Sequence, residues 1–255
     1  MEHLFKAFDK VGLSLKKPDR PFAGNSHIFG LDIRGDNFIA WVPDHVQASV
    51  STKDKKLGQV ILTVKEPRTI FTEEIHAFQR LPGDKVPREI KKGRQKKLLV
   101  ERVTPDVTRH FLCGRDERQH PFIAQLQRGA PTITAAHESL KPPELKGLKI
   151  KGHGKNARVK GKRPSVHRQG EWFFKKATAE ELEEIKDFPS RKKIPIESTR
   201  GNPHIADERI FVKGVIFVRG SVRHDEHETL KFPYWMRVFH NQETGAQVAG
   251  RTWVD

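Results

Sequence analysis

Two short segments of the sequence place ionisable side chains next to bulky apolar ones. The first is HRQGEWFF at residues 167–174, where His167, Arg168 and Glu171 stand beside three consecutive aromatic residues. The second is VRGSVRHDEHETL at residues 218–230, which again mixes arginine, histidine and carboxylate. A charge that is buried without a partner is costly, so charges beside core residues have to be paired. The two segments are therefore predicted to form one site.

Histidine, carboxylate and arginine together suit phosphodiester chemistry. A histidine exchanges protons near neutral pH, and an arginine stabilises the charge that develops on a phosphate. Histidine and carboxylate are also ligands for divalent metal ions. The candidate catalytic residues are His167, Glu171, Arg223, His224 and His227, and the candidate metal ligands are His204, His224 and His227.

Structural roles explain the same residues equally simply. A His-x-x-His spacing is a weak motif, because polar turns often contain histidine. Arg219 and Arg223 lie on one face of a predicted strand, where guanidinium groups suit phosphate oxygens or carboxylates. The alternative for these arginines is a surface ion pair, including one with Glu171, worth roughly 0–1 kcal/mol. The sequence contains no P-loop, dinucleotide-binding, nucleophile-elbow or HExxH motif.

The charge balance predicts a polyanionic partner. The chain has 48 Lys and Arg against 32 Asp and Glu, a formal net charge of +16, and a field of that sign attracts nucleic acid. Between Lys146 and Arg163 there are eight Lys or Arg, four Gly and no acidic residue, which favours a flexible linker that becomes ordered on a polyanion. The predicted nucleic-acid-binding residues are Lys149, Lys151, Lys155, Arg158, Lys160, Lys162, Arg163, Arg168 and Arg219.

The elements that position these residues are predicted to be mainly strands. After His27, short segments rich in Val, Ile, Phe and Thr alternate with Gly, Asp, Asn and Pro. Helices are expected at residues 2–10, within 132–145, and near 178–187, where Thr178 and Glu181 match a capping box. The predicted fold is mostly β, at the margin of α+β. Its parts are an N-terminal helix and loop (1–25), a strand-rich domain (26–145), a basic linker (146–166) and a C-terminal β-rich domain (167–255).

The remaining composition limits the compartment and the cofactors. The one cysteine, Cys113, excludes an intramolecular disulfide and a thiolate-rich zinc motif. No apolar run approaches eighteen residues and no signal peptide is recognisable, so a cytoplasmic protein without a membrane span is expected. The favoured interpretation is a nucleic-acid-binding protein; the alternatives are a nuclease centred on the His, Arg and Glu cluster, and an assembly protein that binds an acidic partner. A divalent metal ion is the one cofactor that the residues suggest.

Overall fold

Strands dominate the architecture, which confirms the mostly-β prediction. The structure is a computed structural model of the 255-residue chain. It describes residues 1–22, 27–76, 85–92, 95–116, 119–148, 150–151, 166–196, 203–225, 227–242, 246–248 and 251–253. In these ranges no helix has the length and the apolar character needed to cross a membrane.

The first half of the chain packs two small sheets around an aromatic core. One sheet has the order β1 (Ser14–Lys16), β3 (Asn37–Trp41), β2 (Gly30–Arg34). The other has the order β10 (Pro121–Leu126), β9 (Val107–Arg115), β5 (Gln59–Glu66), β4 (Gln47–Asp54). Helix α1 (Glu2–Asp9) adds Leu4 and Phe8 to the same core. The fully buried rings of this core are Phe8, Phe29, Phe38 and Phe111.

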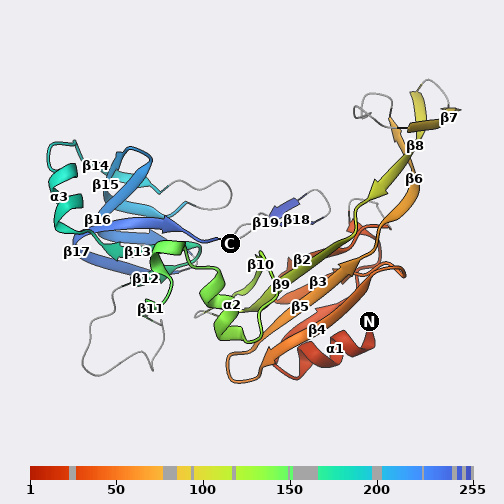
Figure 1. The fold of residues 1–255 in the computed structure, drawn as a ribbon, viewed down its shortest axis with the longest axis horizontal. Coiled ribbons are helices and arrows are strands. Elements are labelled where there is room, and N and C mark those ends of the chain that lie inside the picture. The colour runs from red at the N-terminus through yellow and green to blue at the C-terminus, as the bar shows by residue number, and fades with distance from the viewer. Residues whose placement is uncertain are drawn as a thin grey trace.

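A three-stranded ribbon projects from this half. Its order is β6 (Thr69–His76), β8 (Gln95–Thr104), β7 (Lys85–Lys92), and all pairings are antiparallel. Figure 1 shows β6 and β8 leading away from the two small sheets, with β7 at the far end of the ribbon.

A helical segment links the two halves. Helix α2 (Ile133–Ser139) begins at the N-cap Thr132, whose hydroxyl accepts a hydrogen bond from the Ala135 amide. The short 3-10 helix η3 (Pro143–Leu145) follows, and Leu145 is buried against Val166 and Phe173 of the second half. The core of the second half therefore includes a side chain that precedes the predicted linker.

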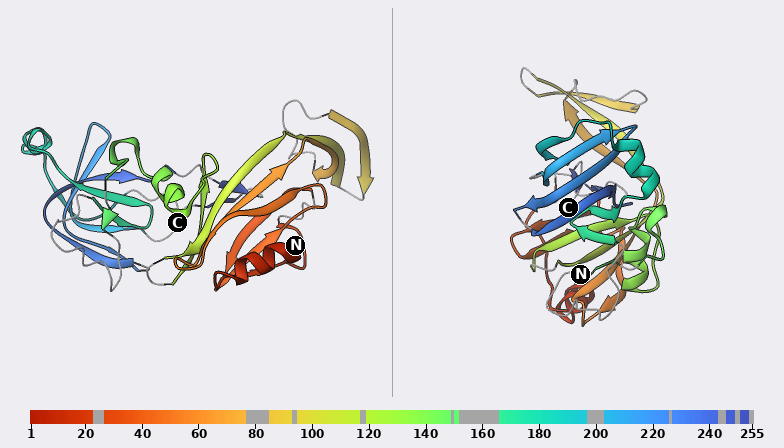
Figure 2. Two further views of the ribbon diagram at one scale, coloured as in Figure 1. Left: turned by 60° about the horizontal axis from the view of Figure 1, so that its bottom comes forward. Right: turned by 90° about the vertical axis from the view of Figure 1, so that its left-hand side faces the viewer.

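The second half is a single seven-stranded sheet with one capped helix (Figure 2). Only the β11–β12 pairing is parallel. Helix α3 (Ala179–Ile185) has the predicted capping box between Thr178 and Glu181. The strand order is β11 (Ile150–Lys151), β12 (Val166–Gln169), β13 (Trp172–Lys176), β17 (His227–His240), β16 (Val215–His224), β15 (Ile205–Val212), β14 (Arg191–Pro195).

The end of β17 returns to the first half. The Gln242 amide donates to the Leu140 carbonyl at 2.8 Å, and Gln127 Nε2 donates to the Gln242 carbonyl at 3.4 Å. A small hairpin of β18 (Ala246–Val248) and β19 (Arg251–Trp253) follows. Directly after β17, the chain thus contacts the helical segment that precedes the seven-stranded sheet in the sequence.

The predicted linker at 146–166 lies only in part within the described residues. Leu148 packs against the second-half core, and β11 belongs to the seven-stranded sheet, although both lie in the predicted linker at 146–166. Residues 152–165 lie outside the described residues. The apolar side chain of Leu148 explains its packing against this core.

Candidate functional site

Strand pairing brings three histidines to the same end of the seven-stranded sheet. His224 ends β16 and His227 begins β17, and the two are cross-strand partners at the turn of this hairpin. On the other side of β16, the pairing of Ile205 with Arg223 places His204, the residue before β15, beside His224. The polar run HDEHE between two apolar strands is typical of such a turn.

The three rings form a compact cluster, called here the histidine cluster (His204, His224 and His227). One ring nitrogen from each residue lies within 4.8 Å of the ring nitrogens of the other two. The ring centroids are 4.3 Å apart for His204 and His224, 4.8 Å for His224 and His227, and 5.5 Å for His204 and His227. Side chains at this spacing can share one ligand.

His204 is the most buried of the three. It is 1% exposed, and neither ring nitrogen has a hydrogen-bond partner within the described part of the chain. Burial, followed by the nearby rings of His224 and His227, lowers the pKa of His204 to about 3. The ring is therefore neutral at pH 7, the form in which imidazole offers a lone pair to a metal ion.

Two carboxylates stand next to the cluster. Glu171 is 4% exposed, and its Oε1 lies 3.8 Å from His204 Nδ1. Asp116 Oδ2 lies 3.9 Å from His227 Nδ1. Both distances exceed a normal hydrogen bond, so these are close approaches. Asp116 comes from the β9–β10 hairpin of the first half, where its Oδ1 accepts from the His120 amide.

The turn between β12 and β13 closes the site on another side. Gly170 has φ +56°, and a Cβ at this position would lie 2.8 Å from His227 Nε2. Gln169 Nε2 donates to the Glu228 carbonyl at 2.6 Å and to the Val222 carbonyl at 3.4 Å. The structure thus brings the two segments at 167–174 and 218–230 together, as a single site requires.

Arg219 and Arg223 have carboxylate partners on the neighbouring strand. Arg219 forms a two-pronged ion pair with Glu208, at 3.1 and 2.7 Å, and lies over the Trp235 ring. Arg223 Nη1 lies 2.6 Å from Asp207 Oδ1. The hydrogen bond from Arg223, with one from the Ser221 amide, lowers the pKa of Asp207 to about 2. The structure therefore shows the ion-pair alternative, with Glu208 and Asp207 as partners in place of Glu171.

Two other predicted site residues lie apart from the histidine cluster. The His167 ring packs edge-on against Phe232, with centroids 5.2 Å apart. Arg168 Nε donates to the Gly170 carbonyl at 2.7 Å, and its guanidinium lies over the Phe173 ring. Both contacts belong to the packing of β12. The predicted binding residues Lys149, Lys155, Arg158, Lys160, Lys162 and Arg163 lie outside the described residues, and Lys151 lies in the short strand β11.

Asp116 is the one residue of the site that the sequence did not indicate. It lies in the hairpin between β9 and β10 of the first half. Nothing in a local motif reveals that such a tip touches a turn in the other half of the chain.

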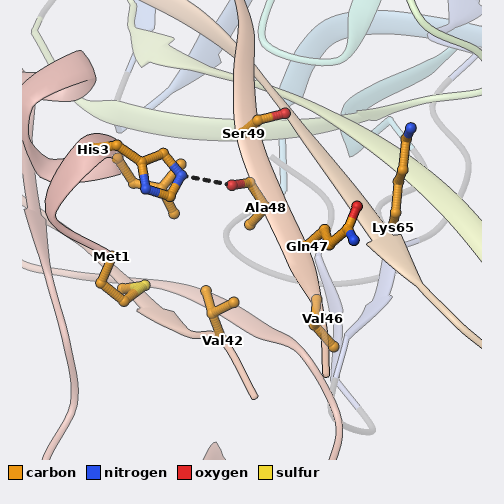
Figure 3. Close-up of a pocket in the computed structure, with 9 residues that line it drawn as sticks. Met1, His3, Val42, Val46, Gln47, Ala48, Ser49 and Lys65 are labelled. Carbon is orange, nitrogen blue, oxygen red and sulfur yellow. Dashed lines mark hydrogen bonds between the residues drawn. The ribbon is translucent and has the colours of Figure 1, made fainter. Parts of the chain in front are cut away.

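A hollow lies between α1 and β4 (Figure 3). Met1, Val42 and Val46 give it apolar walls. His3 Nε2 donates to the Ala48 carbonyl at 2.8 Å and so has a structural role. The polar side chains of this hollow do not converge as the three histidines do, so the histidine cluster is the candidate functional site.

Comparison of the chain with protein-family models, with curated proteins and with solved structures finds no match. The function is therefore inferred from the geometry of the histidine cluster and from the charge of the chain.

Proposed function

We propose that this protein binds nucleic acid, with the β7–β8 hairpin as a principal contact. Residues 85–97 contain seven Lys or Arg and one acidic residue. This range includes β7 and the start of β8, which pair with each other in the projecting ribbon (Figure 1). A high density of basic residues on a hairpin that projects from the two small sheets is the observation that carries the proposal, because positive charge attracts the phosphate backbone of nucleic acid.

The strand register supports a polyanionic partner for this hairpin. Lys91 is the cross-strand partner of Lys96, and Ile90 is the partner of Lys97. Like charges directly opposite one another destabilise a strand pair. Phosphate groups relieve this repulsion, and a two-stranded ribbon has dimensions that the major groove of DNA accommodates. The net charge of +16 adds long-range attraction for the same partner.

The proposal is tested by changing Lys91, Lys92, Lys96 and Lys97 to Gln and titrating labelled duplex DNA and RNA at several salt concentrations. Removal of each phosphate contact should lower the slope of log affinity against log salt by about one unit. The matched control removes four exposed lysines of the β4–β5 hairpin, Lys53, Lys55, Lys56 and Lys65. An equal effect of the two variants would assign the binding to net charge alone, and an unchanged slope in the ribbon variant would overturn the assignment to the ribbon.

A nuclease activity is the second candidate, and the histidine cluster favours it. Three imidazoles beside two carboxylates are suited to a metal-bound water or to acid–base chemistry. His224→Ala and His227→Ala should then abolish cleavage of labelled RNA or DNA while most of the affinity remains. EDTA should inhibit a metal-assisted reaction and leave a metal-free one unchanged. Intact substrates after incubation of the wild-type protein with Mg²⁺, Mn²⁺ or Zn²⁺ would exclude this candidate.

A further inference from the structure

We propose that the histidine cluster binds one divalent transition-metal ion of the zinc type, held by the imidazoles of His204, His224 and His227. This inference is independent of nucleic-acid binding, because it concerns a different part of the molecule and rests on different residues. It is carried by the geometry of the cluster, by the burial of His204 and by the carboxylates beside it.

The spacing of the ring nitrogens is close to what an ion requires. Zinc–nitrogen bonds are about 2.0–2.1 Å long, so two ligands of a tetrahedral site stand roughly 3.4 Å apart. The three donor nitrogens of the cluster already lie within 4.8 Å of one another. Ring rotations that move each nitrogen by about 1 Å suffice to close the difference.

The burial of His204 points independently to a ligand. A polar atom that is buried without a hydrogen bond costs about 1–3 kcal/mol. Both ring nitrogens of His204 are in this state with respect to the described residues, and the side chain is 1% exposed. A metal ion bound to one nitrogen removes that cost. With the imidazole ligated, a small movement of Glu171, now 3.8 Å away, lets the other nitrogen donate.

The carboxylates occupy the positions that support metal-bound histidines. A metal-ligating histidine normally donates its second N–H to a carboxylate or carbonyl, which fixes the ring and raises its basicity. The ring nitrogens that approach Glu171 and Asp116 are His204 Nδ1 and His227 Nδ1, respectively. This arrangement assigns the Nε2 atoms of His204 and His227 to the ion.

Gly170 keeps open the space between His227 Nε2 and the His204 ring. A Cβ at this position would lie 2.8 Å from His227 Nε2 and 3.5 Å from His204 Cε1. The glycine therefore borders the volume in which the Nε2 atoms meet, and any side chain there would intrude on an ion.

The ligand set selects the class of metal. Imidazole suits zinc, copper, nickel and cobalt, whereas magnesium and calcium prefer oxygen ligands. Three protein ligands leave a fourth position of a tetrahedral ion for water or for an anion. The inference is thus a three-histidine site with an exchangeable fourth ligand.

Cobalt(II) and zinc titrations of the untagged, full-length, EDTA-treated protein test the inference. We expect one ion per chain, visible absorption of tetrahedral cobalt that zinc abolishes, and a rise in Tm with zinc. His224→Ala should reduce the affinity at least tenfold, whereas His3→Ala, a histidine outside the cluster, should leave it unchanged. Glu171→Gln and Asp116→Asn should each weaken binding about 10–100-fold, as loss of a supporting carboxylate does.

Several results would overturn the inference. These are the absence of saturable binding, a cobalt spectrum that is unchanged in His224→Ala, or equal losses in His224→Ala and His3→Ala. Because His204→Ala removes a buried ring and can prevent folding, His224→Ala is the primary variant, and its far-UV circular dichroism is recorded alongside. Nucleic-acid affinity is measured on the same samples, so that failure of the metal site and failure of the proposed function are separate results.

Discussion

Gly170 carries two distinct constraints at one residue. Its φ of +56° lies in the left-handed region, and its missing Cβ leaves room for His227. Gly12 shares the first constraint, with φ +80°, but a Cβ there would meet nothing within 4 Å. A comparison of alanine substitutions at Gly12 and Gly170 therefore separates the free-energy cost of backbone strain from the cost of placing a side chain beside His227.

Gly12→Ala is expected to lower the free energy of unfolding by about 1–2 kcal/mol, the strain of a left-handed residue with a side chain. Gly170→Ala should cost a further ~1–3 kcal/mol, because the methyl group collides with the His227 ring. Urea unfolding of the two variants measures the difference. Equal losses would show that the His227 ring moves away freely, contrary to a tightly built site.

His137, which lies outside the histidine cluster, is expected to make the free energy of unfolding depend on pH. Burial, followed by the positive charge of Arg168, lowers its pKa to about 4, and its Nε2 contacts Gln59 Oε1 at 2.8 Å. The unfolded chain binds this proton near pH 6.5, so between about pH 6.5 and 4 the unfolded state holds more protons than the folded state. The stability that neutral His137 contributes is therefore complete above about pH 6.5 and is lost as the pH falls.

Wild-type protein should consequently lose about 1–2 kcal/mol more unfolding free energy than His137→Gln when the pH falls from about 7 to about 5. The glutamine keeps an amide that can bond to Gln59 but does not titrate. Urea unfolding at the two pH values gives the comparison, in which all other histidines are common to both proteins. Parallel pH profiles would contradict the assignment.

At the residue scale, the residue types indicated most members of the candidate site but not the contacts that they make. His204, His224, His227 and Glu171 were recognisable because charged groups beside aromatic ones need partners. Asp116 was not, since its contact with His227 is set by how the two halves pack. The partners of Arg219 and Arg223 were also missed, because they depend on the register of β15 against β16.

The position of helix α3 was predictable from the capping box at its N-terminus. The Thr178 hydroxyl accepts from the Glu181 amide at 3.2 Å, and the Glu181 carboxylate accepts from the Thr178 amide at 2.9 Å. Glu181 also accepts from Arg237 Nη1 at 2.8 Å, which fastens the helix to β17. Local signals of this kind reveal an element, while the seven-stranded order depends on pairings between distant segments.

Thr178→Ala should lower the free energy of unfolding by about 1 kcal/mol, because the Glu181 amide loses its acceptor. Thr178→Ser is the matched control and should remain close to the wild-type protein, since the hydroxyl is kept. Thermal and urea unfolding of both variants provide the measurement. A loss of similar size in the serine variant would point to the methyl group of Thr178 and away from the cap.

For the whole molecule, the net charge of +16 is the property on which the proposed nucleic-acid binding rests. The basic segment at 146–163 is expected to bind phosphate groups, as the ribbon is. Changing Lys149, Lys151, Lys160 and Lys162 to Gln should lower the salt dependence of duplex binding by about one unit for each phosphate that the segment no longer neutralises. The ribbon variant carries the same change in charge and serves as the comparison. A slope equal to that of the wild-type protein would remove the segment from the binding surface.

Because the chain returns from β17 to α2, the two halves of the protein are expected to stay associated after the polypeptide is cut between them. Leu145 is buried in the core of the second half, and the Gln242 amide donates a hydrogen bond to the Leu140 carbonyl. Asp116 adds a polar approach to His227. A protease site inserted at 152–165 and then cleaved should therefore yield two fragments that stay together as a non-covalent pair, co-eluting in gel filtration until denaturant separates them. The two fragments expressed separately should likewise reconstitute the fold, so that this chain behaves as a split protein whose complementation reports on the interface between its halves.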